Sequence, residues 1–209
     1  MSMLPFSVQL SIDEILQNAH DFNPRKAMTV DLRPAVEALF RELEEKGVDH
    51  VLVGGVALLS YVEGRNTQDI DLIVKAEDAA AIDWNAKVVD RDFGQASYRG
   101  VRVDLLLRTN PVFDYVAEHE RTRADFHGRR VPIATRKGLL LLKLYALPSL
   151  YRNGQLARAA LYETDVRMLH QGADIDDGEL LSRLEAHLSR SDIAELSRIL
   201  DEQRAKRRF

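Results

Sequence analysis

The sequence has no cysteine among its 209 residues. A chain without thiols cannot form disulfides, and it cannot supply a thiolate nucleophile, an iron–sulfur cluster or a cysteine-ligated zinc site. It also lacks a strong excess of either charge, because 29 Lys and Arg face 33 Asp and Glu and leave a formal net charge of -4. The net charge therefore favours neither nucleic acid nor an anionic membrane as a partner.

Signals for membranes, secretion and several common catalytic sites are missing as well. No apolar run approaches the roughly 18 residues that suggest a membrane span, and the start MSMLPFSVQL has no basic segment typical of a secretory signal. The six histidines show no metal-ligand spacing, and P-loop, dinucleotide-binding, serine-hydrolase and zinc-protease motifs do not occur. With 45% hydrophobic residues, we expect a folded, soluble, cytoplasmic protein with no membrane partner.

The pattern of predicted elements changes at about residue 135. We predict an N-terminal arm over 1–30, an α/β domain over 31–134 and a helical domain over 135–209. The fold class expected is therefore α+β with a helical C-terminal domain. Within 31–134, the pattern predicts strands at 48–55, 69–74 and 101–107, a hairpin over 122–134, and helices at 31–46, 56–64, 75–86 and 112–119. Within 135–209 it predicts helices at 135–147, 155–170, 176–188 and 191–206, with breaks at Pro148, Gly172 and Ser191.

Two carboxylates stand inside a hydrophobic strand. Asp69 and Asp71 are two residues apart in DIDLIV (69–74), so both side chains project from one face of the predicted strand. Two like charges there repel each other and lose hydration unless a cation neutralises them. Mg²⁺ suits such a pair, because it prefers oxygen ligands and takes one or two protein carboxylates. The alternative is an edge strand whose polar face is solvated.

A glycine pair precedes these acids. Gly54 and Gly55 lie where the predicted strand turns into a helix, so backbone N–H groups and the helix N-terminus could approach a phosphate closely. A plain tight turn is the alternative. Thirteen residues separate Gly55 from Asp69, which is enough for one helix and a loop. The glycines and the carboxylates could therefore meet at one end of the same sheet.

The combined pattern, hydrophobic-Gly-Gly and then Asp-hydrophobic-Asp-hydrophobic, resembles the signature of the nucleotidyltransferase superfamily, the DNA polymerase β-like fold. GGVAL followed by RNTQDIDLIV is similar to the AbiEii-type and minimal nucleotidyltransferases of bacterial toxin–antitoxin and phage-defence loci. The resemblance covers 51–74 closely and 101–107 loosely, and the C-terminal helices only in outline. It implies a mixed sheet with flanking helices and a third carboxylate on a neighbouring strand. Asp104 in VRVDLLL (101–107) is the candidate, and an ion pair with Arg102 or Arg99 is the alternative.

The resemblance also implies a mechanism. Two Mg²⁺ or Mn²⁺ ions held by Asp69, Asp71 and Asp104 would clamp the α-phosphate of a nucleoside triphosphate. Asp104 would lie nearest the acceptor hydroxyl and could help to deprotonate it. Gly54 and Gly55 would hold the β- and γ-phosphates.

Four further residues are candidates for nucleotide binding. Arg65 and Thr67 resemble an R-x-T lead-in to the acidic strand, and they either contact phosphate or only hold the loop. Lys143 is a lone cation in LLLLKLYAL (139–147); such a lysine usually extends to the surface, but in the AbiEii-type branch a similar lysine reaches the triphosphate. Asp165 resembles an acidic position in that branch's next helix, and a surface ion pair with Arg158 or Arg167 is its alternative.

The segment 121–137 is rich in positive charge. Its basic side chains are Arg121, Arg123, Arg129, Arg130, Arg136 and Lys137, against Asp125 alone. This run is a candidate surface for nucleic acid or triphosphate, and a solvated hairpin is the alternative.

Taken together, the sequence predicts a metal-dependent nucleotidyltransferase that moves a nucleoside monophosphate to a hydroxyl. The acceptor could be RNA (tRNA in particular), a protein side chain, or a small molecule such as an antibiotic. A cognate toxin or antitoxin is a further expected partner. A regulatory module that binds nucleotide without catalysis, or acts as an antitoxin, is the alternative on the same fold, and a structural domain with an accidental motif is a third.

Overall fold

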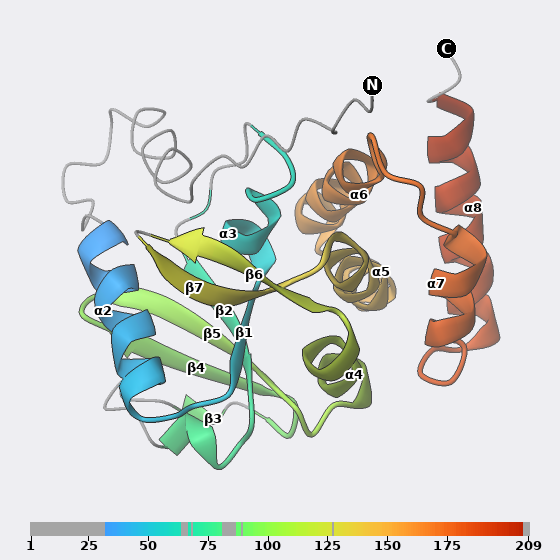
Figure 1. Cartoon of the computed structure of the whole chain (residues 1–209). Coiled ribbons are helices and arrows are strands. Elements are labelled where there is room, and N and C mark those ends of the chain that lie inside the picture. The colour runs from blue at the N-terminus through green and yellow to red at the C-terminus, as the bar shows by residue number, and fades with distance from the viewer. Residues whose placement is uncertain are drawn as a thin grey trace, which may run out of the picture.

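The computed structural model describes residues 32–63, 67, 69–80, 87–88, 90–126 and 128–206 (Figure 1). Within these residues the chain forms a mixed seven-stranded sheet in the order β3-β4-β5-β2-β1-β7-β6. The β2–β5 and β1–β7 pairs are parallel and the other neighbours are antiparallel. The strands are β1 (His50–Val53), β2 (Asp69–Val74), β3 (Lys87–Val88), β4 (Phe93–Tyr98), β5 (Val101–Leu107), β6 (Arg121–Phe126) and β7 (Arg129–Ala134).

Helices cover the sheet on both sides. In Figure 1, α2 lies to one side of the strands, α4, α5 and α6 lie to the other, and α7 and α8 are farthest away. The helices are α2 (Leu32–Glu45), α3 (Gly54–Leu58), α4 (Pro111–His119), α5 (Arg136–Arg152), α6 (Leu156–His170), α7 (Asp177–Leu184) and α8 (Arg190–Lys206), with a 3₁₀ turn at Asp78–Ala80. The predicted α+β class, a mixed sheet with flanking helices, is confirmed.

Helix α5 is the central helix of the C-terminal half. Its run LLLLKL is buried on nearly all sides, because α3, α4, α6, α7, α8 and β7 all contact it. A helix that is apolar all round is expected in such a position. Thr135 caps its first turn, since Oγ1 accepts the Gly138 N–H at 3.0 Å. The helix therefore has one fixed start, next to the end of β7.

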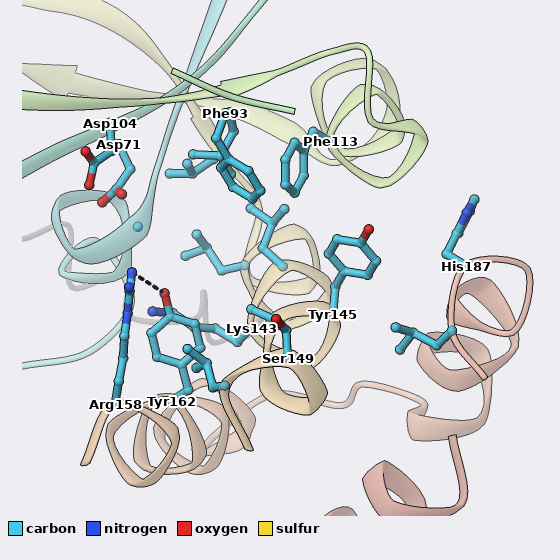
Figure 2. Close-up of a pocket in the computed structure, with 18 of the residues that line it drawn as sticks. Asp71, Phe93, Asp104, Phe113, Lys143, Tyr145, Ser149, Arg158, Tyr162 and His187 are labelled. Atoms are coloured by element: carbon cyan, nitrogen blue, oxygen red, sulfur yellow. Dashed lines mark hydrogen bonds between the residues drawn. The ribbon is translucent and has the colours of Figure 1, made fainter. Parts of the chain in front are cut away.

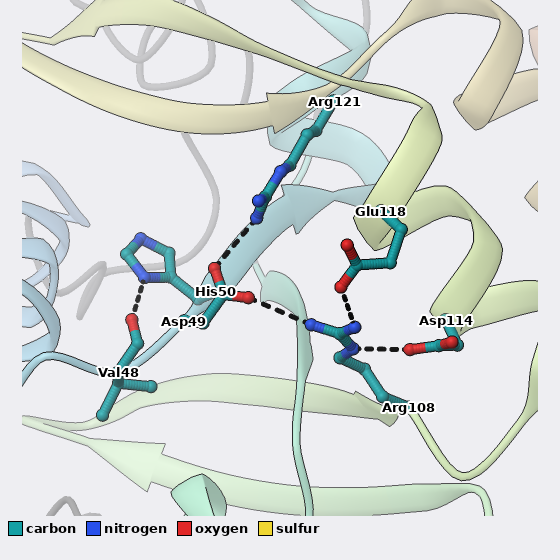
Figure 3. Close-up of polar contacts among 7 residues, drawn as sticks. All are labelled: Val48, Asp49, His50, Arg108, Asp114, Glu118 and Arg121. Atoms are coloured by element: carbon teal, nitrogen blue, oxygen red, sulfur yellow. Dashed lines mark hydrogen bonds and ion pairs between the residues drawn. The ribbon is translucent and has the colours of Figure 1, made fainter.

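An ion-pair cluster around Arg108 holds α4 against the sheet (Figure 3). Its guanidinium donates to Asp114 at 2.7 Å and to Asp49 at 3.0 Å, and it also contacts Glu118. Arg121 donates to the other Asp49 oxygen at 2.9 Å. Because the Arg108 side chain is only 11% exposed, solvent screens these pairs only partly. The cluster joins the start of β1, the end of β5, α4 and β6.

Several predicted boundaries are wrong. The first strand ends at Val53, and the helix after it spans Gly54–Leu58 instead of 56–64, because the glycines themselves form its first turn. Helix α5 runs through Pro148 to Arg152 instead of breaking there. Proline removes one helical N–H, and the burial of Pro148 and of its neighbour Leu147 offsets that loss.

Two strands were not predicted, and some predictions fall outside the described residues. Strand β4 has the sequence FGQASY, whose glycine and small polar residues favour strands weakly, and β3 has only two residues. Of the predicted helix 75–86, the structure shows a 3₁₀ turn at Asp78–Ala80, and 81–86 lie outside the described residues, as does the predicted arm 1–30. The domain boundaries stay predictions, since one buried cluster runs from α2 through the sheet to α8. In the described part of the chain, no helix is both long and apolar enough to cross a membrane.

Candidate active site

The three predicted acids lie on the two central strands of the sheet. Strands β2 and β5 are parallel neighbours, and their register places Asp71 beside Asp104 and Asp69 beside Arg102. Asp69 and Asp71 are half-buried on one face of β2, while Ile70 and Leu72 are buried on the other. Strand β5 alternates in the same way. The sheet therefore brings carboxylates from distant parts of the sequence side by side.

The glycine turn packs directly on Asp71. Gly54 has a φ of +64°, and a Cβ there would lie 1.8 Å from Asp71 Oδ2. The backbone N–H of Gly55 donates to Asp71. A Cβ on Gly55 would lie 2.5 Å from Thr67 Oγ1. Both glycines are therefore required by close approach, and the predicted meeting of the glycine turn with the acidic strand is confirmed.

Thr67 holds Asp69. Its hydroxyl lies 3.0 Å from Asp69 Oδ1 and 3.3 Å from the Asp69 carbonyl oxygen. Of its two predicted roles, these contacts favour holding the loop. Arg65 lies outside the described residues.

Negative charge is concentrated at Asp71. Burial, together with the nearby charges of Asp69 and Asp104, raises the pKa of Asp71 to about 6, against the opposing effects of Lys143 and the Gly55 N–H. Crowded carboxylate oxygens of this kind are the donor set that Mg²⁺ and Mn²⁺ prefer. Among the described residues, however, no group of three or more acids or histidines is arranged to hold a metal ion. The carboxylate of Asp104 is turned to Arg102, which donates to both of its oxygens.

Lys143 and Asp165 form a buried ion pair between α5 and α6. Lys143 Nζ lies 3.0 Å from Asp165 Oδ2, and their side chains are 7% and 0% exposed. The same ammonium lies 3.7 Å from the centroid of the Tyr162 ring, a cation–π contact. The surface alternatives considered for both residues are wrong, because the packing of α5 on α6 encloses them.

A cavity of about 640 Å³ is lined by Asp71 and Asp104 and by Lys143. Figure 2 shows Asp71 and Asp104 on the sheet side, with Lys143, Tyr162 and Arg158 facing them from the helices. A chain of aromatic rings continues the wall: Phe93 meets Phe113 edge-on at 5.4 Å between centroids, and Phe113 meets Tyr145 at 6.0 Å. Phe93 is 44% exposed.

Sequence reasoning missed most of the cavity's helix side and its aromatic wall. Phe93 stands at the start of β4, a strand that was not predicted. Arg158 was considered only as a partner for Asp165, but it lies over the Tyr162 ring, 5.6 Å from its centroid, and lines the cavity. Tyr145 and Ser149 are four residues apart on α5 and both line the cavity, and this spacing was the available signal for a shared wall.

The basic segment 121–137 is largely paired within the fold. Arg121 contacts Asp49, Arg129 contacts Glu44, and Lys137 contacts Glu120 and Glu179. Arg136 donates to the carbonyl oxygens of Leu169 and Gln171. These contacts give four of the six cations a structural role.

Comparison with known proteins identifies the fold. No protein-family model matches the sequence, and no curated protein matches it. The structure is similar to an antigenic nucleotidyltransferase-like protein from Paracoccidioides brasiliensis, with a TM-score of 0.59, 15% identity, and coverage of 84% of this chain and 89% of that one. It is also similar to ANT(2")-Ia, solved with adenylyl-2"-tobramycin, with a TM-score of 0.50, 12% identity, and coverage of 85% and 99%. The chain therefore has the fold of nucleotidyltransferase-like proteins.

Proposed function

We propose that this protein is a metal-dependent nucleotidyltransferase that transfers a nucleoside monophosphate from a nucleoside triphosphate to a hydroxyl group. One observation carries the proposal. Two carboxylates on adjacent strands, Asp71 and Asp104, face the ammonium of Lys143 across a single cavity. A metal-bound triphosphate needs anionic ligands for the cation and a cation for its own phosphates.

Asp69, Asp71 and Asp104 would hold one or two Mg²⁺ or Mn²⁺ ions. Burial and the nearby charges of Asp69 and Asp104 raise the pKa of Asp71, and a divalent cation would offset both effects, so the chemistry of the donor set fits. When bound, such cations polarise the α-phosphate and stabilise the charge of the leaving pyrophosphate. Thr67 fixes the Asp69 carboxylate through its hydroxyl.

The remaining residues bind and orient the substrates. Lys143 binds the triphosphate from the helix side, and Asp165 holds its ammonium in place. Gly54 and Gly55 bring the backbone close to the acids and contact the β- and γ-phosphates. Asp104 accepts the proton of the acceptor hydroxyl once its carboxylate is free to do so.

For the acceptor, we propose a hydroxyl on RNA or on a protein, within a toxin–antitoxin or defence system of the AbiEii-type branch. The wall of Phe93, Phe113 and Tyr145 supports an acceptor with a flat ring, because a base or a tyrosine ring can pack on the exposed face of Phe93. A nucleotide-binding regulatory or antitoxin module remains the alternative. It has less need of three acids at one place on the sheet.

A small-molecule acceptor is a second candidate, because ANT(2")-Ia shares the fold and was solved with adenylyl-2"-tobramycin. Two acids that line the cavity already have cationic partners, Asp104 with Arg102 and Asp192 with Arg152. The ammonium groups of an aminoglycoside would have to compete with both arginines.

The proposal is tested by label transfer. The protein is incubated with each α-labelled nucleoside triphosphate, Mg²⁺ or Mn²⁺, and in separate reactions total RNA, cell protein or aminoglycosides. We expect label on RNA or protein with the wild type and none with Asp69→Asn/Asp71→Asn. Asp201→Asn/Glu202→Gln removes the same charge from the exposed face of α8 and should retain activity. Nucleotide binding without transfer would favour the regulatory alternative, and label on an aminoglycoside would favour the second candidate.

A further inference from the structure

Arg102 donates two hydrogen bonds to the carboxylate of Asp104. Its Nε donates to Oδ1 and its Nη2 donates to Oδ2, each at 2.8 Å. Both residues project from the same face of β5, since they are two positions apart. Gln95 lies opposite Asp104 on β4, and with its amide oxygen toward Arg102 it accepts from Nε at 3.0 Å and from Nη2 at 3.1 Å. The two-pronged pair is therefore held in place from the neighbouring strand.

The guanidinium of Arg102 interacts with the charges of Asp69 and Asp71 as well as with Asp104. The hydrogen bonding of Arg102 to the Asp104 carboxylate, which accepts, is the main cause of the raised pKa of Arg102, and the charges of Asp69 and Asp71 add to it. The Arg102 side chain is 58% exposed, against 20% for Asp104. It therefore covers the acid from the solvent side, and it can leave without opening the buried core.

A guanidinium that is paired with both oxygens of this carboxylate disfavours a divalent cation beside them. Each Asp104 oxygen already accepts an N–H of Arg102, and the two cationic groups repel each other at contact distance.

We propose that Arg102 competes with divalent cations for Asp104, so that the opening of this ion pair sets the metal affinity of the site. The inference rests on the proposed function for the assignment of Asp104 as a metal ligand. Arg102 is thus a positioning residue that acts through Asp104. Once displaced, its guanidinium stays in the cavity that also holds Lys143, where its planar donors suit phosphate oxygens.

The test measures Mn²⁺ binding without nucleotide, by electron paramagnetic resonance of free Mn²⁺. Arg102→Gln should bind Mn²⁺ roughly two- to five-fold more tightly than the wild type, the range that the loss of a partly exposed ion pair corresponds to. Arg102→Lys keeps the charge but loses the two-pronged contact, so it should give a smaller gain. The matched control is Arg152→Gln, which removes an exposed arginine from the same cavity that pairs with Asp192. Its affinity should stay within about 1.5-fold of the wild type, since the Arg152 side chain is exposed and pairs with Asp192, and solvent screens such a charge.

A double-mutant cycle separates direct competition from a general change in charge. In an Asp104→Asn background, Arg102→Gln should leave the Mn²⁺ affinity unchanged. Equal affinities for the wild type and Arg102→Gln, or an equal gain in Arg152→Gln, would overturn the inference and leave the proposed function intact. No Mn²⁺ binding by the wild type or by any variant would overturn both. Circular dichroism of each variant confirms that it is folded.

Discussion

Gly54 is the residue with the least freedom at the site. Its φ is +64°, and a Cβ would overlap the carboxylate of Asp71. Gly128, in the β6–β7 turn, has a φ of +74° but nothing within 4 Å of an added Cβ. A side chain would be strained by the backbone conformation at both positions, but only at Gly54 would it also overlap a neighbour. The two glycines therefore form a matched pair.

Gly54→Ala should therefore destabilise the protein more than Gly128→Ala. Both variants place alanine in the left-handed region, which costs about 1–2 kcal/mol. Only Gly54→Ala must also displace Asp71, so we expect at least about 1 kcal/mol more, together with loss of nucleotidyl transfer. Urea unfolding and label transfer measure the two effects. Equal losses of stability would show that the turn relaxes without moving Asp71.

Substitutions in the buried pair of Lys143 and Asp165 can separate its effect on stability from its effect on function. Lys143→Met removes the ammonium that contacts Asp165, whose side chain is 0% exposed. About 3 kcal/mol or more of the free energy of unfolding should therefore be lost. The double variant Lys143→Met/Asp165→Leu should recover much of that loss, because no charge is then left buried. Its transfer activity should stay low. Recovery of both properties would exclude a role for Lys143 in triphosphate binding.

Between elements, one carboxylate connects three helices of the C-terminal half. Asp177 at the start of α7 accepts from His170 Nε2 of α6 at 2.7 Å and from Arg204 of α8 at 2.6 Å. The other ring nitrogen of His170 lies 2.8 Å from the Val166 carbonyl oxygen. Asp177 is also in the first turn of α7, where a negative charge is favourable.

Asp177→Asn should loosen the contact of α6, α7 and α8. We expect a loss of about 1.5–3 kcal/mol of unfolding free energy, since the hydrogen bond of the 2% exposed His170 side chain to a carboxylate becomes one to a neutral amide. Glu202→Gln is the control: it breaks an exposed pair with Arg198 on α8, which is worth under about 1 kcal/mol. Guanidinium unfolding of both variants provides the comparison. Similar losses would show that the link contributes no more than a surface pair.

The contact of α2 with the sheet depends on a neutral His50. The His50 ring stacks on Phe40 of α2 with centroids 5.9 Å apart, and its Nδ1–H donates to the Val48 carbonyl oxygen at 2.9 Å (Figure 3). Its Nε2 has no hydrogen-bond partner among the residues that the structure describes. Burial, the main cause, lowers the pKa of His50 below its usual 6.5.

His50 should therefore make the fold less stable in acid. As the pH falls, His50 takes up a proton near pH 6.5 in the unfolded chain, and only at a lower pH in the folded protein. The contribution of neutral His50 to the stability of the fold is therefore complete above pH 6.5. The contribution falls as the pH drops from 6.5 toward the lowered pKa of the folded state. Urea unfolding at a series of pH values should show this decline, and His50→Asn should reduce its slope. An unchanged slope in the variant would assign the decline to other groups.

For the whole molecule, bound nucleotide should raise the global stability. A ligand present at 100 times its dissociation constant stabilises the folded state by about 2.7 kcal/mol. We expect a shift of this size for the wild type with a nucleoside triphosphate and Mn²⁺, and little shift for Asp69→Asn/Asp71→Asn. Chemical unfolding with and without the ligands measures it. An equal shift in the variant would place the binding site away from β2.

Much of the sheet side of the site was predictable because its signals are local. The spacing of Asp69 and Asp71 defines one strand face, and the glycine pair marks the turn that must approach them. The likeness in fold to nucleotidyltransferase-like proteins agrees with the resemblance read from these residues. The AbiEii-type branch, the acceptor and the bound metal stay predictions.

The helix side was not predictable in the same way. An isolated Lys143 in an apolar helix is compatible with either exposure or burial, and only the packing of α5 on α6 places it against Asp165 and Tyr162. Phe93 depended on β4, whose weak strand propensity concealed it.

The sequence by itself determined the α+β class, the acidic strand and the glycine turn, since these follow from residue type and spacing over a few positions. Only the tertiary structure decided which side chains share the cavity, and that Asp104 faces Arg102 there rather than an open site. The reason is physical: burial and charge pairing depend on which surfaces of distant elements exclude water together, and no local pattern specifies that contact.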